Sequence, residues 1–222
     1  MKKEETLPIS SSCFVDANII FYIDKLKDKA GFINVLEQVY ESVYIHEEVY
    51  KELSSSSQKF VDNKCQEQKW ILLNPLQEFK TTYSDYQLML TKIQEKLIEV
   101  DKRRGKEGSV GTGEIASLAA AYMLNAEIIC SNDYSLEDVI VEVPLHIFIN
   151  GNEESEPVYI KHHRLLDFCE LVVFGKIIKR SEVRKFYQIA HIELKKEKPE
   201  VYKLILAEFD ERIPAKITLK NF

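Results

Sequence analysis

The sequence predicts a three-layer α/β/α fold with a central twisted parallel sheet, followed by a helical extension at the carboxyl end. Two observations support this fold class. Short apolar runs alternate with longer segments of helical periodicity, which is typical of β-α-β units. Acidic residues also recur where a predicted strand ends or a predicted helix begins, and open α/β sheets place their functional sites there. The chain has 222 residues, of which 45% are hydrophobic, and can therefore bury a core of ordinary size.

The predicted strands are short, and most are followed by a helix. Strands are predicted at residues 13–17, 42–45, 70–73 and 127–130, with a last strand at 145–149. Helices are predicted at residues 18–23, 31–41, 46–53, 58–68, 114–124, 135–140, 164–178, 181–196 and 199–211. Residues 76–102 repeat apolar positions at intervals of three and four, and their length favours two helices in a projecting hairpin, within an insertion at about 76–106.

The chain is predicted to have two parts of opposite charge. Residues 1–150 form the α/β domain and residues 157–222 form a basic helical extension, with a short acidic linker between them. Residues 1–156 carry 16 Lys and Arg against 27 Asp and Glu, whereas residues 157–222 carry 14 against 9. An acidic body argues against nucleic-acid binding, unless some of the acids collect a metal ion and a basic surface nearby holds the phosphates. The two parts are therefore expected to face different partners.

The start of the chain and its cysteines bear on its location. The charged sequence Met-Lys-Lys-Glu-Glu lacks the apolar core of a signal peptide, and no run approaches the roughly 18 apolar residues of a membrane-spanning helix. We therefore expect a cytoplasmic protein with no membrane partner. The four cysteines, Cys13, Cys65, Cys130 and Cys169, have no metal-like spacing, which predicts reduced thiols and no zinc site.

Three acidic residues occupy corresponding places in the predicted fold. Asp16 lies where the first strand passes into a helix, and Asp133 follows the fourth strand. Glu114 lies in the first turn of an apolar helix that begins after a Gly-Thr-Gly turn. The carboxyl ends of parallel strands meet at one edge of a sheet, so these three side chains are expected to converge. For Asp16 alone, a helix-capping role is an equally good interpretation.

A fourth acid is expected from the helix that follows the second strand. Glu48 and Glu52 are one turn apart on one face of this helix, with Glu47 beside them. For any one of these residues, a solvated helix face is the simpler interpretation. With the three acids above, Glu52 would complete a pocket of four carboxylates.

Such a pocket predicts a particular chemistry. Carboxylates a few ångströms apart repel and raise one another's pKa, so a cluster of them persists where something positive lies between them. Hard divalent cations with oxygen ligands, Mg²⁺ or Mn²⁺, suit this role. Because such ions lower the pKa of a bound water and neutralise charge on a phosphorane-like transition state, the implied reaction is hydrolysis of a phosphodiester.

Four segments resemble the motifs of the PIN domain, a family of metal-dependent nucleases that includes many ribonucleases. They are Val-Asp-Ala-Asn-Ile at 15–19, the strand and helix at 43–53, Gly-Thr-Gly-Glu-Ile-Ala-Ser-Leu-Ala at 111–119, and Ile-Cys-Ser-Asn-Asp at 129–133. The resemblance covers residues 13–149, and the third motif is the most specific. It implies a PIN-like fold and a metal-dependent nuclease.

The resemblance also implies roles for individual residues. The catalytic metal ligands correspond to Asp16, Glu52, Glu114 and Asp133. In the second motif the family usually has a Glu just before a Leu, which selects Glu52. Glu48, on the same face of the helix, is the alternative. Asn18 and Ser131 would be polar supports that fix the first and fourth carboxylates. The long insertion and the basic tail depart from compact members of the family, so the resemblance does not imply a substrate.

Lys102, Arg103, Arg104 and Lys106 form a basic cluster before the loop that leads to Glu114. The cluster could bind substrate phosphates, or it could be a solvated helix end whose cations the helix dipole favours.

The function that these features favour is an endoribonuclease that cleaves single-stranded or looped RNA, as a toxin or defence effector. Since a free nuclease would harm its host, we expect an inhibitory protein partner, as in a toxin–antitoxin pair, or a homo-oligomer. Two alternatives stay open. One is a PIN-like scaffold that binds protein or RNA with little catalysis, and the other is a nuclease directed at DNA.

Overall fold

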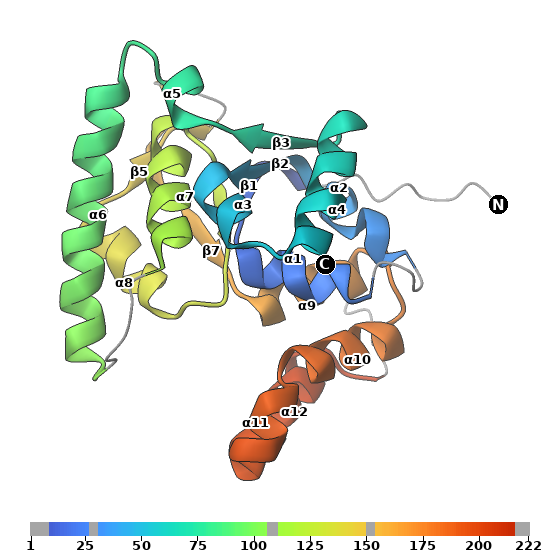
Figure 1. Ribbon diagram of the computed structural model, residues 1–222. Coiled ribbons are helices and arrows are strands. Elements are labelled where there is room, and N and C mark those ends of the chain that lie inside the picture. The colour runs from blue at the N-terminus through green and yellow to red at the C-terminus, as the bar shows by residue number, and fades with distance from the viewer. Residues whose placement is uncertain (1–8, 27–30, 106–110, 150–153, 216–222) are drawn as a thin grey trace.

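The predicted three-layer α/β/α architecture is confirmed by the computed structural model, which describes residues 9–26, 31–105, 111–149 and 154–215 (Figure 1). Its central sheet has five strands in the order β3-β2-β1-β4-β7, and each neighbouring pair is parallel. The strands are β1 (Ile9–Val15), β2 (Tyr40–His46), β3 (Trp70–Leu73), β4 (Ile128–Cys130) and β7 (Lys161–His163).

Successive side chains of each strand enter opposite layers, because side chains alternate along a strand. Cys13 and Val15 of β1 belong to one hydrophobic core, while Phe14 between them belongs to the other. The first core is covered by α1 (Ala17–Asp24), η1 (Phe32–Asn34), α2 (Val35–Val39), α4 (Ser55–Gln66), α9 (Leu165–Phe174) and α10 (Arg180–Ala190). The sheet is therefore buried on both faces, as parallel sheets require.

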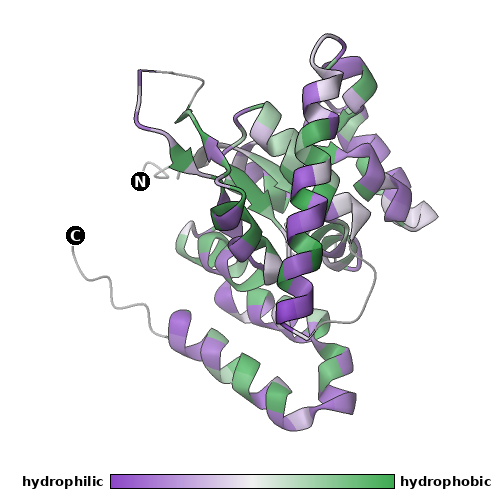
Figure 2. Cartoon of the chain, turned by 90° about the vertical axis from the view of Figure 1, so that its left-hand side faces the viewer, coloured by the Kyte–Doolittle hydropathy of each residue, from purple (hydrophilic) through white to green (hydrophobic). Residues whose placement is uncertain are grey.

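The second core lies under α6 (Tyr83–Arg103), α7 (Thr112–Met123) and α8 (Ser135–Glu142). In α7 the small side chains of Ala119, Ala120 and Ala121 are fully buried and let this helix lie close to the sheet. The long helix α6 packs on the outer side of this core and buries one stripe of side chains at helical spacing. The outer side of α6 is largely polar (Figure 2). Two short helices, α3 (Glu47–Glu52) and α5 (Pro75–Glu78), follow β2 and β3.

The edge of the sheet differs from the prediction. Residues 145–149 were expected to be the last strand, but they contain only β5 (His146–Ile147), which pairs antiparallel with β6 (Val158–Tyr159) in a separate two-stranded sheet. The fifth position beside β4 is taken by β7, from the region that the sequence assigned to the extension. The sequence of β7 is Lys-His-His, and an edge strand tolerates such polar residues because it is not fully enclosed.

Two helical predictions are also corrected. The projecting hairpin expected at residues 76–102 is instead one short helix, α5, followed by the 21-residue helix α6, which packs on the second core along its length. The helix expected at 181–196 is divided at His191 into α10 and α11 (Ile192–Glu197). There the ring Nδ1 of His191 lies 2.9 Å from the carbonyl oxygen of Tyr187.

The helical extension is present and shares the first core. In Figure 1 the helices α10, α11 and α12 (Pro199–Arg212) form an arm below the sheet. The arm is anchored by Phe186, whose ring centroid lies 5.2 Å from that of Phe32 and 6.3 Å from that of Phe168. Among the described residues, no helix has both the length and the apolar character needed to cross a membrane.

Candidate active site

Asp16 directly follows β1 at the carboxyl edge of the sheet. Its backbone N–H donates to Cys130 O at 2.9 Å, which ties this turn to the end of β4. Its side chain caps α1 by accepting from Asn18 N at 3.2 Å, so the capping role considered from the sequence is observed. Burial, with a smaller contribution from the charge of Glu52, raises the pKa of Asp16 to about 6, although hydrogen bonds from Asn18 and Ala17 oppose the rise.

Glu52, the last residue of α3, reaches the amino end of α7. Its Oε1 accepts from Gly113 N at 3.0 Å and from Thr112 Oγ1 at 3.2 Å, where the helix dipole favours a negative charge. A Cβ at Gly113 would lie 3.0 Å from Glu52 Oε1 and 2.9 Å from a Val49 methyl group. Glycine is therefore what allows α3 and its carboxylate to approach α7 so closely.

Glu114 lies in the first turn of α7 and folds back over the turn before it. A Cβ at Gly111 would lie only 1.9 Å from Glu114 Oε2, so the carboxyl group occupies the space that this glycine leaves. Ser131 Oγ donates to the other oxygen, Oε1, at 3.3 Å. Burial raises the pKa of Glu114 to about 8, and the negative charges of Asp16, Asp133 and Glu52 contribute to the rise.

Asp133 and Ser131 form the turn between β4 and α8. Asp133 N donates to Ser131 Oγ at 3.2 Å, and Asp133 Oδ1 accepts from Ser135 N at 2.8 Å. Ser131 is fully buried and supports both Glu114 and the backbone of Asp133. The sequence predicted a support for the Asp133 carboxylate, whereas the carboxylate that Ser131 contacts is that of Glu114.

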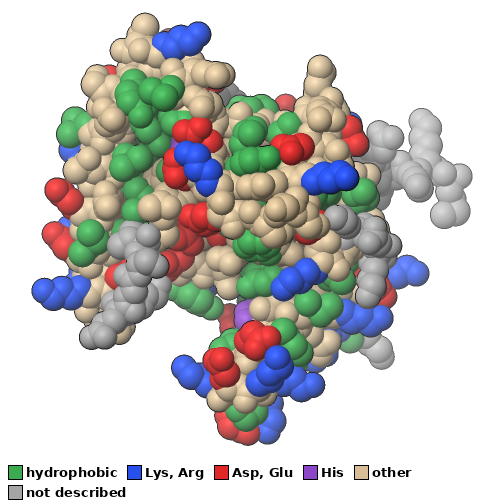
Figure 3. Space-filling view, in the orientation of Figure 1, with side chains coloured by type: hydrophobic (Ala, Val, Ile, Leu, Met, Phe, Trp, Pro, Cys, Tyr) green, Lys and Arg blue, Asp and Glu red, His purple; other side chains and the backbone are tan. Residues whose placement is uncertain are grey.

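Electrostatically the four acids form one group. Each of the other three raises the pKa of Glu114, and Glu52 also raises that of Asp16. None of the ion pairs found between described residues involves Asp16, Glu52 or Glu114. Figure 3 shows acidic side chains gathered in a hollow near the middle of this face of the molecule. Within the described ranges, no three His, Cys, Asp or Glu side chains are already arranged to hold a metal ion.

Asn18 and Glu48, the two other residues predicted to support the site, make different contacts from each other. Asn18 is exposed at the start of α1 and acts on Asp16 through hydrogen bonds that lower its pKa. Glu48, the alternative to Glu52, instead pairs with Lys51, whose Nζ lies 2.6 Å from its Oε1. Of the three acids on α3, only Glu52 is found to act on Asp16 and Glu114.

The basic cluster before α7 is partly engaged. Arg103 Nη2 lies 2.5 Å from Glu142 Oε1, and Arg104 Nη2 lies 2.8 Å from Asp138 Oδ2, both acids being on α8. Lys102 is exposed near the end of α6, and Lys106 lies outside the described residues. These two arginines therefore join α6 to α8, and a phosphate would compete with their carboxylate partners.

No family model, curated protein or solved structure matches this chain. The likeness to the PIN domain therefore stays a prediction that rests on the four motifs.

One further residue at this edge of the sheet was not predicted from the sequence. Arg164 directly follows β7, and its guanidinium carbon lies 4.7 Å from the ring centroid of Tyr134, the residue after Asp133. Tyr134 is 50% exposed. A lone Arg at the start of a helix gives no signal in the sequence, because its place beside β4 depends on the unrecognised strand β7.

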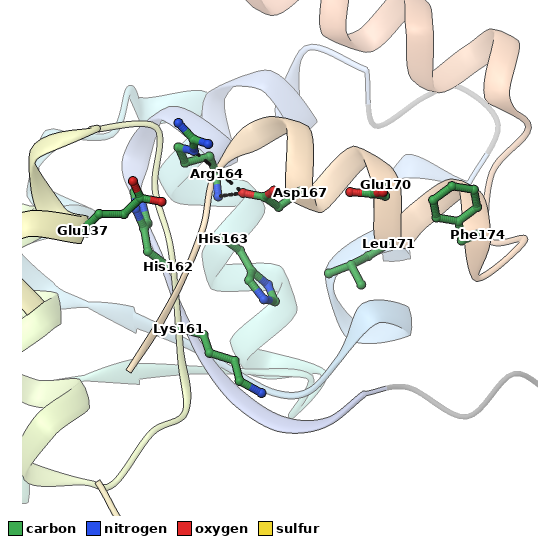
Figure 4. A pocket seen from close by; sticks show the side chains of 9 residues that line it. All are labelled: Glu137, Lys161, His162, His163, Arg164, Asp167, Glu170, Leu171 and Phe174. Atoms are coloured by element: carbon green, nitrogen blue, oxygen red, sulfur yellow. Dashed lines mark hydrogen bonds and ion pairs between the residues drawn. The ribbon is translucent and has the colours of Figure 1, made fainter. Parts of the chain in front are cut away.

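A larger pocket of about 580 Å³ lies beyond β7, against α9 (Figure 4). Two acids of its lining have arginine partners: Asp167 pairs with both Arg164 and Arg212, and Glu170 pairs with Arg212. His162 Nε2 lies 3.0 Å from Ser131 O and so braces the turn that carries Ser131. Asp167 and Glu170 thus differ from Asp16, Glu52 and Glu114, which take part in none of the ion pairs between described residues.

Proposed function

We propose that this chain is an Mg²⁺- or Mn²⁺-dependent endoribonuclease of the PIN type. The observation that carries the proposal is the position of Glu114, whose carboxyl group lies over Gly111 within hydrogen-bond reach of Ser131 and whose pKa is raised to about 8 by burial and by three neighbouring acids. A carboxyl group in such a place either keeps its proton or shares a cation, and hard divalent ions suit a site made of carboxylate oxygens. Because ionised carboxylates repel one another, the ligands of such an ion need not be preformed.

The residues that would hold the ion are Asp16, Glu52, Glu114 and Asp133. When bound, a divalent cation lowers the pKa of an attacking water and offsets the negative charge that develops on the phosphate. Ser131 orients Glu114 by donating to Oε1, while the N–H of Asp133 fixes the Ser131 hydroxyl. Arg164, held beside Tyr134, offers a guanidinium to a neighbouring phosphate of the substrate.

A binding scaffold without catalysis is the second candidate, and one observation favours it. Asp16 and Asp133 accept local backbone hydrogen bonds, and Glu52 accepts from the amino end of α7, so all three help to hold the fold. Glu114 is different, since its only hydrogen bond among the described residues is the one from Ser131. Because Glu114 contributes little to holding the fold and its pKa is far above the ordinary value, this residue favours an enzyme over a binding scaffold.

The test is cleavage of labelled single-stranded RNA and DNA by the purified protein, with Mg²⁺ or Mn²⁺ and with a chelator. The variants are Asp16→Asn and Glu114→Gln, with Glu67→Gln as a control at an exposed carboxylate at the carboxyl end of α4. We expect RNA cleavage that needs the cation, falls by roughly 10² or more in both site variants and is unchanged in the control. Equal cleavage by all variants would indicate a contaminating nuclease and reject the proposal. Cleavage of DNA but not RNA would show that the substrate is DNA.

A further inference from the structure

A second, smaller pocket adjoins the four acids. It has a volume of about 240 Å³ and lies between α3, α6 and α7. Thr112 lines it and also donates to Glu52 Oε1, and Glu48 lines it one helical turn before Glu52. Its volume is about that of eight water molecules, which suits one flat ring system. The pocket is therefore a neighbour of the proposed reaction site.

The hydrogen bonds of His46 determine how the pocket presents its one buried hydroxyl group. Glu48 N donates to His46 Nδ1 at 3.0 Å, so Nδ1 carries the lone pair and the ring proton is on Nε2. Burial lowers the pKa of His46 to about 4, and the ring is therefore neutral. It follows that Nε2–H donates to Tyr86 Oη, 3.0 Å away.

Tyr86 consequently has a proton left to donate. Its oxygen already accepts from His46, and no second partner for the hydroxyl is found among the described residues. The side chain is 3% exposed, and burial raises the pKa of Tyr86 well above its ordinary value, so the proton stays on the oxygen. A buried donor of this kind needs an acceptor, and the pocket is where a ligand could supply one.

The remaining lining selects the kind of ligand. The rings of Tyr83 and Tyr86, with centroids 5.9 Å apart, provide aromatic surface. Gln94 and Glu48 provide hydrogen-bond acceptors, Glu48 through Oε2, because its Oε1 pairs with Lys51. No Lys or Arg lines the pocket, so a phosphate is a poor fit. The pocket thus places a hydroxyl donor and a carboxylate acceptor beside aromatic rings, which complements a flat ring that carries a nitrogen acceptor next to an amino group.

We propose that this pocket binds an amino-bearing nucleobase, adenine or cytosine, of the RNA nucleotide next to the scissile phosphate. The inference rests on the proposed ribonuclease function for its substrate, but the binding itself does not require catalysis. The Tyr86 hydroxyl donates to the ring nitrogen, and the exocyclic amine donates to Glu48. Uracil has a carbonyl group in place of the amine and would set an oxygen against this carboxylate.

The first test is binding of adenosine, cytidine and uridine at millimolar concentrations, in chelator, followed by amide chemical shifts in NMR spectra. The variants are Tyr86→Phe and Glu48→Gln, with Tyr159→Phe as a matched control on an exposed tyrosine. We expect adenosine and cytidine to shift amides of α3 and α6, with affinity reduced roughly tenfold in both pocket variants and unchanged in the control. Glu48→Gln alters a surface side chain, so it keeps the test informative if Tyr86→Phe unfolds.

Uridine binding as tightly as cytidine, or pocket variants binding like the wild type, would overturn the proposal. The same nucleosides should bind Glu114→Gln as tightly as the wild type, because that residue does not line the pocket. A second test is cleavage of RNAs that differ at one position, where a preference for A or C should be lost in Tyr86→Phe. If the protein cleaves RNA but neither binds nucleosides nor prefers A or C, the base-binding proposal is rejected and the ribonuclease proposal stands. If it binds nucleosides but does not cleave RNA, the ribonuclease proposal is rejected and the base-binding proposal stands.

Discussion

Replacing Glu114 by Gln should stabilise the protein in the absence of divalent cations. The folded-state pKa of this acid is about 8, against an ordinary value of 4.5, so the folded state holds a proton that the unfolded chain releases as the pH rises. The wild type therefore loses stability between about pH 4.5 and pH 8, by at most about 5 kcal/mol in total. Side-chain rearrangement relieves part of this cost, and we expect a gain of about 2–3 kcal/mol for the variant at pH 7.

The structure indicates that Gln is tolerated at this position. Its amide oxygen can still accept from Ser131 Oγ, and it is no larger than the carboxyl group that lies over Gly111. The assay is urea unfolding of the wild type, Glu114→Gln and the control Glu67→Gln in chelator, at several pH values from 4 to 9. The stability difference between Glu114→Gln and the wild type should be small near pH 4, grow with pH and level off above about pH 8.

Adding Mn²⁺ should reverse this order, because a cation that binds only the folded wild-type site stabilises it by mass action. The control should follow the wild type under every condition. A pH-independent difference, or a Glu114→Gln protein that is less stable than the wild type in chelator, would refute the electrostatic reasoning. It would mean that favourable contacts of the ionised Glu114 carboxylate outweigh the cost of its burial and of its repulsion by the neighbouring acids.

Two further predictions concern contacts of the site, and one concerns an ion pair elsewhere in the fold. Gly113→Ala should lower RNA cleavage at least tenfold, because its Cβ would lie 3.0 Å from Glu52 Oε1 and displace that carboxylate. The rate of cleavage is measured together with the melting temperature, which shows whether the variant is folded. Lys64→Met should cost about 1–3 kcal/mol in urea unfolding, because Glu37, whose side chain is 15% exposed, would lose the ammonium group now 2.5 Å away and keep only the hydrogen bond from Trp70 Nε1. Adding Glu37→Gln should recover part of the loss. Arg164→Ala should weaken RNA binding and reduce the slope of log affinity against log salt by about one, as expected for a lost phosphate contact; an unchanged slope would exclude that contact.

The sheet and its acids were predictable because they depend on local patterns. Strand β4 occupies residues 128–130 of the predicted 127–130 and is buried throughout, and short apolar runs between helical segments are characteristic of buried parallel strands. Once the strands are parallel, residues that follow them must lie at one edge, and this places Asp16 and Asp133 without any knowledge of tertiary contacts. The alternation of strands and helices was therefore sufficient for the fold class.

Strand β7 and the pairing of the basic cluster could not be predicted in this way. β7 is defined by backbone hydrogen bonds, such as the one from Lys161 N to Glu127 O at 2.8 Å, and its polar sequence has no strand periodicity. The partner of Arg104 is Asp138, which lies 34 residues away in the chain. Such contacts depend on how α6 packs beside α8, and sequence spacing carries no information about that.

The sequence also could not decide between Glu48 and Glu52, although both belong to one short helix. Helical spacing places both on one face of α3, and it cannot say which one meets the amino end of another helix. The structure distinguishes them through glycine. Because Gly113 has no side chain, α7 comes close enough for the Gly113 amide and the Thr112 hydroxyl to donate to Glu52, while Glu48 remains beside Tyr86 and the smaller pocket. If both proposals hold, these two acids of one short helix have separate tasks, one at the reacting phosphate and one at the base beside it. Substituting Glu52 should then abolish cleavage of every RNA, whereas substituting Glu48 should change which RNAs are cleaved.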